Sequence, residues 1–253
     1  MSKTRIYQNT DFIVNSTVKL SDDAFGHMVR VLRLNEGDIV TLFNGNESNS
    51  KEVFQYTARL VDVKKKHASV EIISQETISN ESPLNIHLGQ GISRGDRMDF
   101  TLQKSVELGV SKITPLFTER CGVKLSSERL AKKQDQWQKI VISACEQSGR
   151  CIVPLVSEPM LLQDWLNEQT NALKLNLHPK AEHSIMTLPM DKPANELSIR
   201  LLIGPEGGLT DEEISQANSA SFQDILLGPR VLRTETAALT AITALQCRFG
   251  DLK

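Results

Sequence analysis

The 253-residue sequence lacks the patterns of metal and redox sites. Its four cysteines are Cys121, Cys145, Cys151 and Cys247, and no two of them form a C-x-x-C pair. None of its five histidines completes a zinc-type spacing, and no H-E-x-x-H motif occurs. The sequence therefore predicts no metal site, and we expect four reduced thiols in core positions.

Long apolar segments are missing as well. No apolar run approaches the ~18 residues that a membrane span needs. The basic start MSKTRIYQNT is not followed by the apolar core of a secretory signal. Hydrophobic residues make up 40% and charged residues 24% of the chain, a mixture typical of globular proteins. We expect a cytoplasmic protein with no membrane partner.

The net charge of −2 argues against a generally basic nucleic-acid-binding protein, but the charges are unevenly distributed. Residues 84–155 carry 11 Lys and Arg against 7 Asp and Glu, a balance of +4, whereas residues 156–225 carry 4 against 11, a balance of −7. Such polarity would let one face bind a polyanion while the other stays solvated. Chance patterning on solvated helices explains the same numbers equally well.

Residues 1–73 are predicted to form a small barrel of about five strands with one helix. The turn signals include Asn44-Gly45, and Lys64–Lys66 stand between the last two expected strands. Ser21 can cap the helix. The apolar face of that helix would hold Phe25, Met28 and Leu32. Residues 74–83 are polar, lack periodicity and end in proline, so they are the predicted linker.

From residue 84 onward, expected strands alternate with expected helices. The strand candidates are LNIHLGQ, KITPLF, IVPLV, LKLNL, IRLLIG and DILLG. Thr210 and Glu213 form a capping box before one of the helices. The alternation predicts an α/β fold over residues 84–253, with a mostly parallel sheet covered by helices on both faces.

Two of the expected strands end in Gly-Pro, in LLIGPEGGLTDEE (residues 201–213) and LLGPRVLRTETAAL (residues 226–239). In parallel sheets, ligands bind beyond the carboxyl ends of the strands. Neither G-x-G-x-x-G nor a Gly-Lys dipeptide occurs, so dinucleotides and nucleoside triphosphates are poor candidates. Two stiff loops side by side would form a slot for adenine with a thioether or sulfonium tail. The alternative is that Gly-Pro merely terminates each strand.

Arg230 and Arg233 stand at the start of a helix, where the dipole favours anions rather than cations. Their placement suggests an anionic partner such as an RNA phosphate. Pairing with Glu206 or Glu235 on the surface is the competing explanation. His178, at the end of LKLNL, is more often a capped loop histidine than a base.

The two Gly-Pro segments resemble the signature of SPOUT-class RNA methyltransferases, and within that class the bacterial family that makes 3-methyluridine in 16S rRNA. Further agreement comes from LGQGISRGDRMDFTLQKSVELGVSKITPLFTERCGVKL, ACEQSGR, LKLNLHP, RIY and HMVRVLR, so the resemblance covers almost the whole chain. It implies a deep trefoil knot in the domain over residues 84–253, although chains normally avoid threading. It also implies a PUA-like RNA-binding barrel over residues 1–73 and a homodimer with the site near its interface.

The resemblance implies S-adenosyl-L-methionine (SAM) as cofactor, S-adenosyl-L-homocysteine as product, and 16S rRNA of the small ribosomal subunit as partner. The sulfonium methyl would move to N3 of an unpaired or flipped uridine. The implied cofactor contacts are Leu177, His178, Leu202, Ile203, Gly204, Pro205, Gly208, Leu227, Gly228, Pro229, Val231 and Leu232.

The catalytic candidates are Arg233, Glu206 and Glu235. We expect Arg233 to stabilise the developing uridine anion or to hold the flipped nucleotide. Either glutamate, or solvent, would take the N3 proton. The candidate RNA contacts are Arg5, Arg30, Arg33, Arg94, Arg97, Arg120 and Lys124. A solvated helix end is the alternative explanation for Arg30 and Arg33.

Two functions of other classes compete with this one. A non-catalytic RNA-binding assembly factor with the same fold would not bind SAM. A small-molecule α/β enzyme that uses the Gly-Pro loops for a phosphate substrate would not need residues 1–73.

Overall fold

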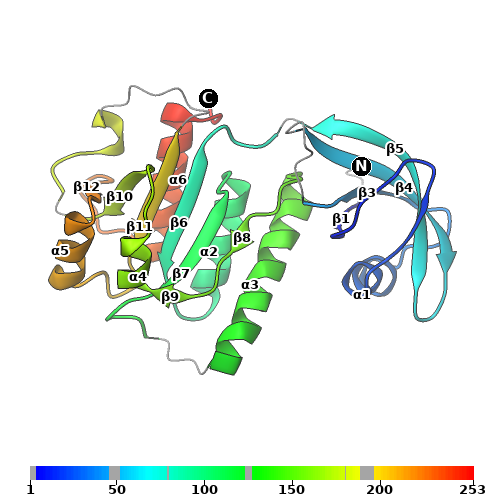
Figure 1. The fold of residues 1–253 in the computed structure, drawn as a ribbon, viewed down its shortest axis with the longest axis horizontal. Coiled ribbons are helices and arrows are strands. Elements are labelled where there is room, and N and C mark those ends of the chain that lie inside the picture. The colour runs from blue at the N-terminus through cyan, green and yellow to red at the C-terminus, as the bar shows by residue number, and fades with distance from the viewer. Residues whose placement is uncertain (1–3, 46–51, 79, 123–126, 180, 189–196) are drawn as a thin grey trace. The chain divides into compact units, whose positions relative to one another are not determined.

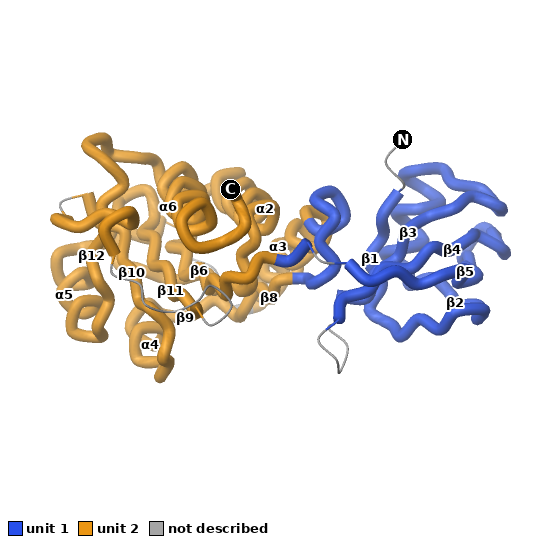
Figure 2. Tube along the Cα trace, turned by 90° about the horizontal axis from the view of Figure 1, so that it is seen from above, with its two compact units in different colours: residues 1–81, 145–153 blue, residues 82–144, 154–253 orange. Residues whose placement is uncertain are grey.

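The computed structural model describes residues 4–45, 52–78, 80–122, 127–179, 181–188 and 197–253. The chain divides into two compact units (Figure 2). Unit 1 contains residues 1–81 together with residues 145–153, and unit 2 contains residues 82–144 together with residues 154–253. The segment 145–153 therefore belongs to unit 1, although the sequence predicts one uninterrupted domain from residue 84.

Unit 1 contains five strands, as predicted: β1 (Arg5–Tyr7), β2 (Thr17–Lys19), β3 (Ile39–Phe43), β4 (Val53–Val63) and β5 (Ala68–Ile78). They form one sheet in the order β1-β3-β4-β5-β2. β1 and β3 are parallel, and the other neighbours are antiparallel. β5 continues to Ile78, so residues 74–78 of the predicted linker are paired with β4, which satisfies their backbone groups.

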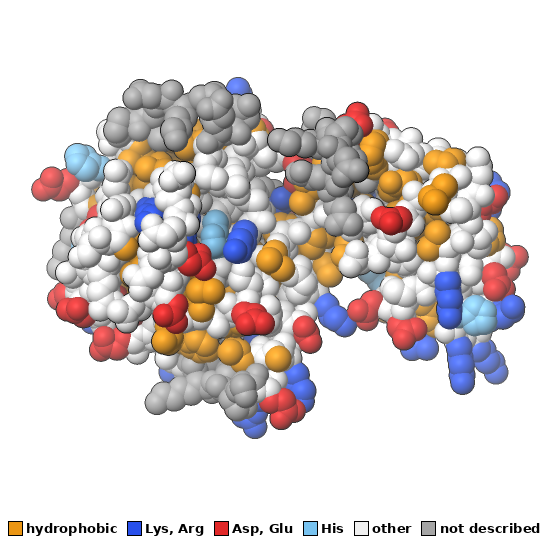
Figure 3. Space-filling view, viewed as in Figure 1, with side chains coloured by type: hydrophobic (Ala, Val, Ile, Leu, Met, Phe, Trp, Pro, Cys, Tyr) orange, Lys and Arg blue, Asp and Glu red, His pale blue; other side chains and the backbone are white. Residues whose placement is uncertain are grey.

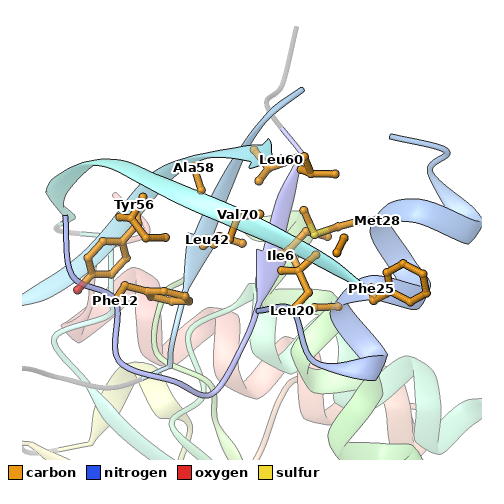
Figure 4. Packing of buried hydrophobic residues seen from close by; sticks show 14 residues of the cluster. Ile6, Phe12, Leu20, Phe25, Met28, Leu42, Tyr56, Ala58, Leu60 and Val70 are labelled. Carbon is orange, nitrogen blue, oxygen red and sulfur yellow. The ribbon is translucent and has the colours of Figure 1, made fainter. Parts of the chain in front are cut away.

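The core of unit 1 lies between this sheet and a short helix (Figure 4). α1 (Asp22–Phe25) begins at Ser21, whose hydroxyl accepts a hydrogen bond from the Ala24 N–H at 3.2 Å, as predicted. The helix continues as a π-helix, η1 (Gly26–Val31). Phe25 and Met28 are buried, but Leu32 is 40% exposed, contrary to the prediction. The wider π turn changes the helical spacing and moves Leu32 off the buried face.

The segment 145–153 is bound to unit 1 by charged side chains. Arg150 is buried and makes an ion pair with Glu81 at 2.7 Å. Glu146 accepts a hydrogen bond from the Tyr7 N–H at 3.0 Å. Burial raises the pKa of Glu146, although the Tyr7 N–H and the charges of His27 and Arg5 oppose that rise. Charged side chains thus hold this segment, which includes most of ACEQSGR.

Unit 2 is the predicted α/β fold (Figure 1). Its strands are β6 (Asn85–Gly91), β7 (Lys112–Phe117), β8 (Leu155–Val156), β9 (Met160–Leu161), β10 (Leu173–Leu177), β11 (Ser198–Ile203) and β12 (Gln223–Ile225). They pair in parallel in the order β12-β10-β11-β6-β7-β8, with β9 beside β7.

The helices of the second half are α2 (Asp96–Glu107), α3 (Ser127–Ser148), α4 (Leu162–Asn167), α5 (Asp211–Ser219) and α6 (Thr234–Phe249), with a 3-10 turn, η2 (Ile185–Thr187). α2 and α6 cover one face of the sheet, and α4 and α5 cover the other (Figures 1 and 2). The predicted capping box of α5 is confirmed, because Thr210 and Glu213 exchange hydrogen bonds.

The cysteines are all free, but only two occupy core positions. Cys145 and Cys151 are buried, Cys121 is half-buried and Cys247 is exposed. The prediction of four core thiols is therefore wrong for Cys121 and Cys247. Cys247 lies on α6 outside the stripe of buried residues that recurs at helical spacing along that helix.

Candidate functional site

The carboxyl ends of β10, β11 and β12 border a cavity of about 550 Å³ within unit 2. Three loops line it, with residues 177–179, 203–209 and 226–235, the last of these without residue 229. Both Gly-Pro turns therefore border one cavity, as their similar sequences predict. Its volume and its position at the carboxyl edge of a parallel sheet are those of a small-molecule site.

Hydrogen bonds hold the first Gly-Pro loop to the start of α6. Thr234 Oγ1 donates to the Gly204 carbonyl at 2.6 Å, and Gln90 Nε2 donates to Thr234 Oγ1 at 2.9 Å. A Cβ on Gly91 would lie 2.5 Å from Pro205 N, so β6 can approach this loop only with glycine there. Sequence reasoning missed Gln90 and Thr234, because their role depends on contacts between distant segments.

The wall of the cavity is mainly apolar, and its turns need glycine. Gly208 has a φ of +68° and Gly228 a φ of +93°, a region that side-chain-bearing residues rarely adopt. The apolar lining residues are Leu177, Pro179, Ile203, Pro205, Leu209, Ile214, Leu226, Leu227, Val231, Leu232 and Ala237. Such a surface suits a flat ring or an aliphatic tail.

Ten of the twelve predicted cofactor contacts line the cavity, and Leu202 and Pro229 do not. Leu202 is fully buried in a cluster with Trp165 and Phe222, on the face of the sheet that α4 and α5 cover. Neighbouring residues of a strand point to opposite faces, so Leu202 and Ile203 cannot both face the cavity.

Glu206, a predicted proton acceptor, accepts hydrogen bonds from two protein groups. Its Oε1 accepts from the Arg94 N–H at 2.9 Å and from Arg97 Nη1 at 3.0 Å. Burial acts to raise the pKa of Glu206, but the hydrogen bonds from Arg94 and Arg97 outweigh it and lower the pKa. The carboxylate is thereby stabilised and becomes a weaker base. Its ion-pair partner is Arg97, not Arg230 or Arg233.

Glu235 is the second residue of α6 and lines the same cavity. Its Oε2 is buried and has no hydrogen-bond partner in the described part of the chain. Arg233 occupies the N-cap position of α6, but its side chain makes no capping hydrogen bond and is exposed to solvent. Glu235 thus lies in the wall of the cavity with one inaccessible carboxylate oxygen, and Arg233 places a cation at the rim.

The predicted RNA contacts of the second domain fall partly on the cavity. Arg97 and Arg120 line it, and Arg120 also donates to the Gly207 carbonyl at 3.0 Å. Arg94 is exposed next to Glu206. Lys124 lies outside the described residues.

Arg5 does not fit the role of an RNA contact. It is half-buried and donates to the Gly149 carbonyl at 2.9 Å and the Arg150 carbonyl at 3.3 Å. The Arg5 guanidinium therefore hydrogen-bonds to backbone carbonyls of unit 1. Arg30 and Arg33 are exposed, and the Arg30 guanidinium lies 5.2 Å from the centre of the Phe25 ring.

The turn between β4 and β5 adds a basic site that the predicted contacts omit. Lys64, Lys65 and Lys66 are all exposed there, and three consecutive lysines are a signal visible in the sequence. On the face drawn in Figure 3, Lys and Arg side chains gather at one end of unit 1.

Two absences apply to the described ranges. They contain no group of three or more His, Cys, Asp or Glu residues that could hold a metal ion. No helix among them is long and apolar enough to cross a membrane.

Both parts of the chain match known protein families. A family model described as an RNA methyltransferase domain matches residues 80–246, and one described as an RNA methyltransferase PUA domain matches residues 20–73. The ribosomal RNA small subunit methyltransferase E of Buchnera aphidicola is 39% identical over 98% of this chain and 95% of its own length.

Two solved structures are similar over nearly their whole length. A methyltransferase from Legionella pneumophila, in complex with SAM, is 45% identical with a TM-score of 0.93 and full coverage of both chains. The ribosomal RNA small subunit methyltransferase E of Neisseria gonorrhoeae, bound to S-adenosyl methionine, is 43% identical with a TM-score of 0.89. It covers 99% of this chain and 100% of its own.

Proposed function

Because the chain belongs to the RNA methyltransferase family that includes the ribosomal RNA small subunit methyltransferases E, we propose that it methylates 16S rRNA with SAM, at N3 of a uridine. The observation that carries the proposal is the cavity bordered by both Gly-Pro loops. Proteins of the same fold that are 45% and 43% identical to this chain hold SAM.

The residues of the cavity fit this cofactor. Its apolar wall suits adenine and the carbons beside sulfur, and the turns at Gly208 and Gly228 bring backbone close to a ligand. When bound, SAM would supply the electrophilic methyl group.

The chain would contribute positioning and charge. Arg233, exposed at the rim, is suited to stabilise the negative charge that develops on the uracil ring as N3 loses its proton. Glu206 is a poor proton acceptor because Arg94 and Arg97 stabilise its ionised form. We therefore assign to solvent the role of accepting the N3 proton.

RNA binding would use both parts of the chain. We assign the RNA-binding role to unit 1, whose strand β5 takes in residues 74–78 of the predicted linker and which includes residues 145–153, and the methyltransferase role to the rest of residues 84–253. The exposed cations of unit 1 include Arg30, Arg33 and Lys64–Lys66. The trefoil knot, the homodimer and the cytoplasmic location stay predictions from the family resemblance.

The direct test is methylation of unmodified small ribosomal subunits in the presence of SAM, read out by nucleoside mass spectrometry. We expect 3-methyluridine to appear only when both protein and SAM are present. A different methylated nucleoside would overturn the uracil-N3 assignment. Binding of the subunit without any methylation would favour the assembly-factor alternative.

A further inference from the structure

We propose that the exposed end of η1, residues 30–33, binds unpaired RNA: its two aliphatic side chains lie against bases, and its two arginines pair with the flanking phosphates. These four residues form what we call the η1 tip. The inference deepens the RNA-binding role proposed for unit 1 and rests on it. It adds an apolar contact, directed at bases, to a unit whose assigned RNA contacts are all cations.

The first argument is the exposure of two neighbouring aliphatic side chains. Val31 is 69% exposed and Leu32 is 40% exposed. Single exposed aliphatic residues are common on protein surfaces, but here two neighbours protrude between Arg30 and Arg33, which are also exposed. Such a patch suits a partner that combines flat apolar faces with negative charge, as unpaired nucleotides do.

The second argument is the helix geometry that causes this exposure. The Leu32 N–H donates to the His27 carbonyl at 2.9 Å, five residues back, as in a π-helix. Phe25 and Met28 of the same helical run belong to the buried core (Figure 4). α-Helical spacing would place Leu32 above Met28 on that buried face, and the wider turn moves it into solvent. π-Helical turns are rare and occur frequently at functional sites.

The third argument is the backbone of Arg33. Its φ is +55°, in the left-handed region that glycine usually occupies after the end of a helix. The Leu34 N–H donates to the Met28 carbonyl at 3.0 Å and so closes the helix end around Arg33. An arginine in this conformation is less stable than a glycine, and residues held in such conformations cluster at functional sites. The strain therefore points to a use for the Arg33 side chain.

The fourth argument is the placement of charge. The Arg30 guanidinium lies 5.2 Å from the centre of the buried Phe25 ring, a contact that orients the guanidinium and leaves its charge in place. Asp22 and Asp23 stand in the first turn of α1, at the opposite end of the helical run. Glu36, the acidic residue nearest to the tip in sequence, is exposed and therefore solvated. The tip thus presents two cations with aliphatic side chains between them.

The partner that fits this surface is RNA with accessible bases. The match to an RNA methyltransferase PUA domain spans residues 20–73 and includes the tip, which favours RNA over a protein partner. A duplex hides the faces of its bases in the stack and presents phosphates and groove edges, whereas unpaired bases expose their faces. The aliphatic pair should therefore contribute to binding of single strands and little to binding of duplexes.

The experiment measures binding of the full chain to a short single-stranded RNA of mixed sequence and to its duplex, by filter retention at several salt concentrations. Val31→Ala and Leu32→Ala remove the aliphatic contacts, and Leu32→Met keeps an apolar side chain of similar volume. Ile13→Ala is the matched control, because Ile13 is also an aliphatic residue of unit 1 that is 69% exposed, but it lies outside the tip.

We expect Kd for the single strand to rise about 5-fold in Val31→Ala and Leu32→Ala, with little change for the duplex. The slope of log K against log salt should stay as in wild type, because no charge is removed. Arg30→Ala should instead reduce that slope by about 0.7. Leu32→Met and Ile13→Ala should bind as wild type does.

Arg33→Gly separates binding from folding. Glycine relieves the strained backbone, so the thermal midpoint should rise by about 2 °C or more. The same change removes a phosphate contact, so Kd for the single strand should rise and the salt slope should fall by about 0.7. A lower midpoint with an unchanged Kd would show that Arg33 serves the fold and would overturn its assignment to RNA.

Kd values within twofold of wild type in both alanine variants would overturn the inference and favour a protein partner for the tip. Equal losses for the single strand and the duplex would overturn the contact with bases, and so would failure of the wild-type chain to bind the single strand. If the tip variants lose RNA binding as expected but wild-type protein methylates no small subunits, the proposed methyltransferase activity fails and the assignment of the tip stands.

Discussion

The two edges of the parallel sheet in unit 2 use charged residues in opposite ways. Towards the amino ends of the strands, Arg200 is buried, lies 3.9 Å from the centre of the Trp165 ring and pairs with Glu168 at 3.1 Å. At the carboxyl ends, Arg230 and Arg233 are exposed around the cavity.

The difference shows how a structural charge is told from a functional one. The Arg200 guanidinium also donates to the Trp165 carbonyl at 2.8 Å, so its position is fixed by protein groups. The Arg233 side chain, by contrast, is exposed to solvent. Changes at the amino edge should therefore affect stability, and changes at the carboxyl edge should affect activity.

Truncation at the amino edge should have the largest effect. Trp165 is fully buried and contacts His87, Phe222 and Arg200. We expect Trp165→Ala to lower the free energy of unfolding by about 3–5 kcal/mol, measured by urea denaturation. Phe100→Ala, at a 46% exposed position of α2, is the control. If Trp165→Ala lowers the free energy of unfolding no more than the control does, the contrast between the two edges of the sheet is refuted.

Arg233→Ala should reduce kcat by roughly 100-fold and leave the free energy of unfolding within about 0.5 kcal/mol of wild type. The reason is that the side chain is exposed to solvent at the rim of the cavity. Single-turnover methylation and urea denaturation measure the two quantities. Arg129→Ala, at an exposed site of α3, should change neither. Near-normal turnover of Arg233→Ala would show that this arginine takes no part in catalysis.

His87 should make the amino edge sensitive to acid. Burial, together with the charges of Lys112 and Arg200, lowers the pKa of His87 to about 3. The unfolded chain binds a proton near pH 6.5 and the folded chain only near pH 3, so stability falls as the pH drops through this window.

Titration of His87 should lower the free energy of unfolding by about 1.4 kcal/mol for each pH unit below pH 6.5, which amounts to roughly 2 kcal/mol at pH 5. Urea denaturation between pH 7 and pH 5 measures it. His87→Gln should flatten the slope, whereas His67→Gln, in the accessible β4–β5 turn, should not. Equal slopes for wild type and His87→Gln would show that other groups cause the acid sensitivity.

The smallest effect is expected for a single rim cation. Arg230→Ala should weaken binding of the small subunit a few-fold and reduce the slope of log K against log salt by about 1. Binding at several salt concentrations, by filter retention, gives that slope. Arg129→Ala again serves as the control. A slope equal to wild type would mean that Arg230 touches no phosphate.

Local patterns predicted most of the fold. Sequence patterns identified the strands of both units except the two-residue β9, and the cap at Ser21 and the capping box of Thr210 and Glu213 depend only on nearby residues. Leu32 was misplaced because a π-helix replaces α-helical spacing over Gly26–Val31. The attachment of residues 145–153 to unit 1 was not predictable, since Glu146 and its partner Tyr7 are 139 positions apart.

The sequence by itself determined that two Gly-Pro turns follow strands of an α/β fold, because strand patterning and turn chemistry are local properties. The strand order β12-β10-β11, which brings both turns to one cavity, was decided by the tertiary structure. Tertiary structure decided which charged residues there are free. Glu206 is bonded to Arg97, 109 positions away, while Glu235 keeps an unpartnered oxygen. Arg5 is likewise used internally, whereas Arg233 is exposed. Partners so distant along the chain leave no local signal, so only the folded chain separates structural charges from functional ones.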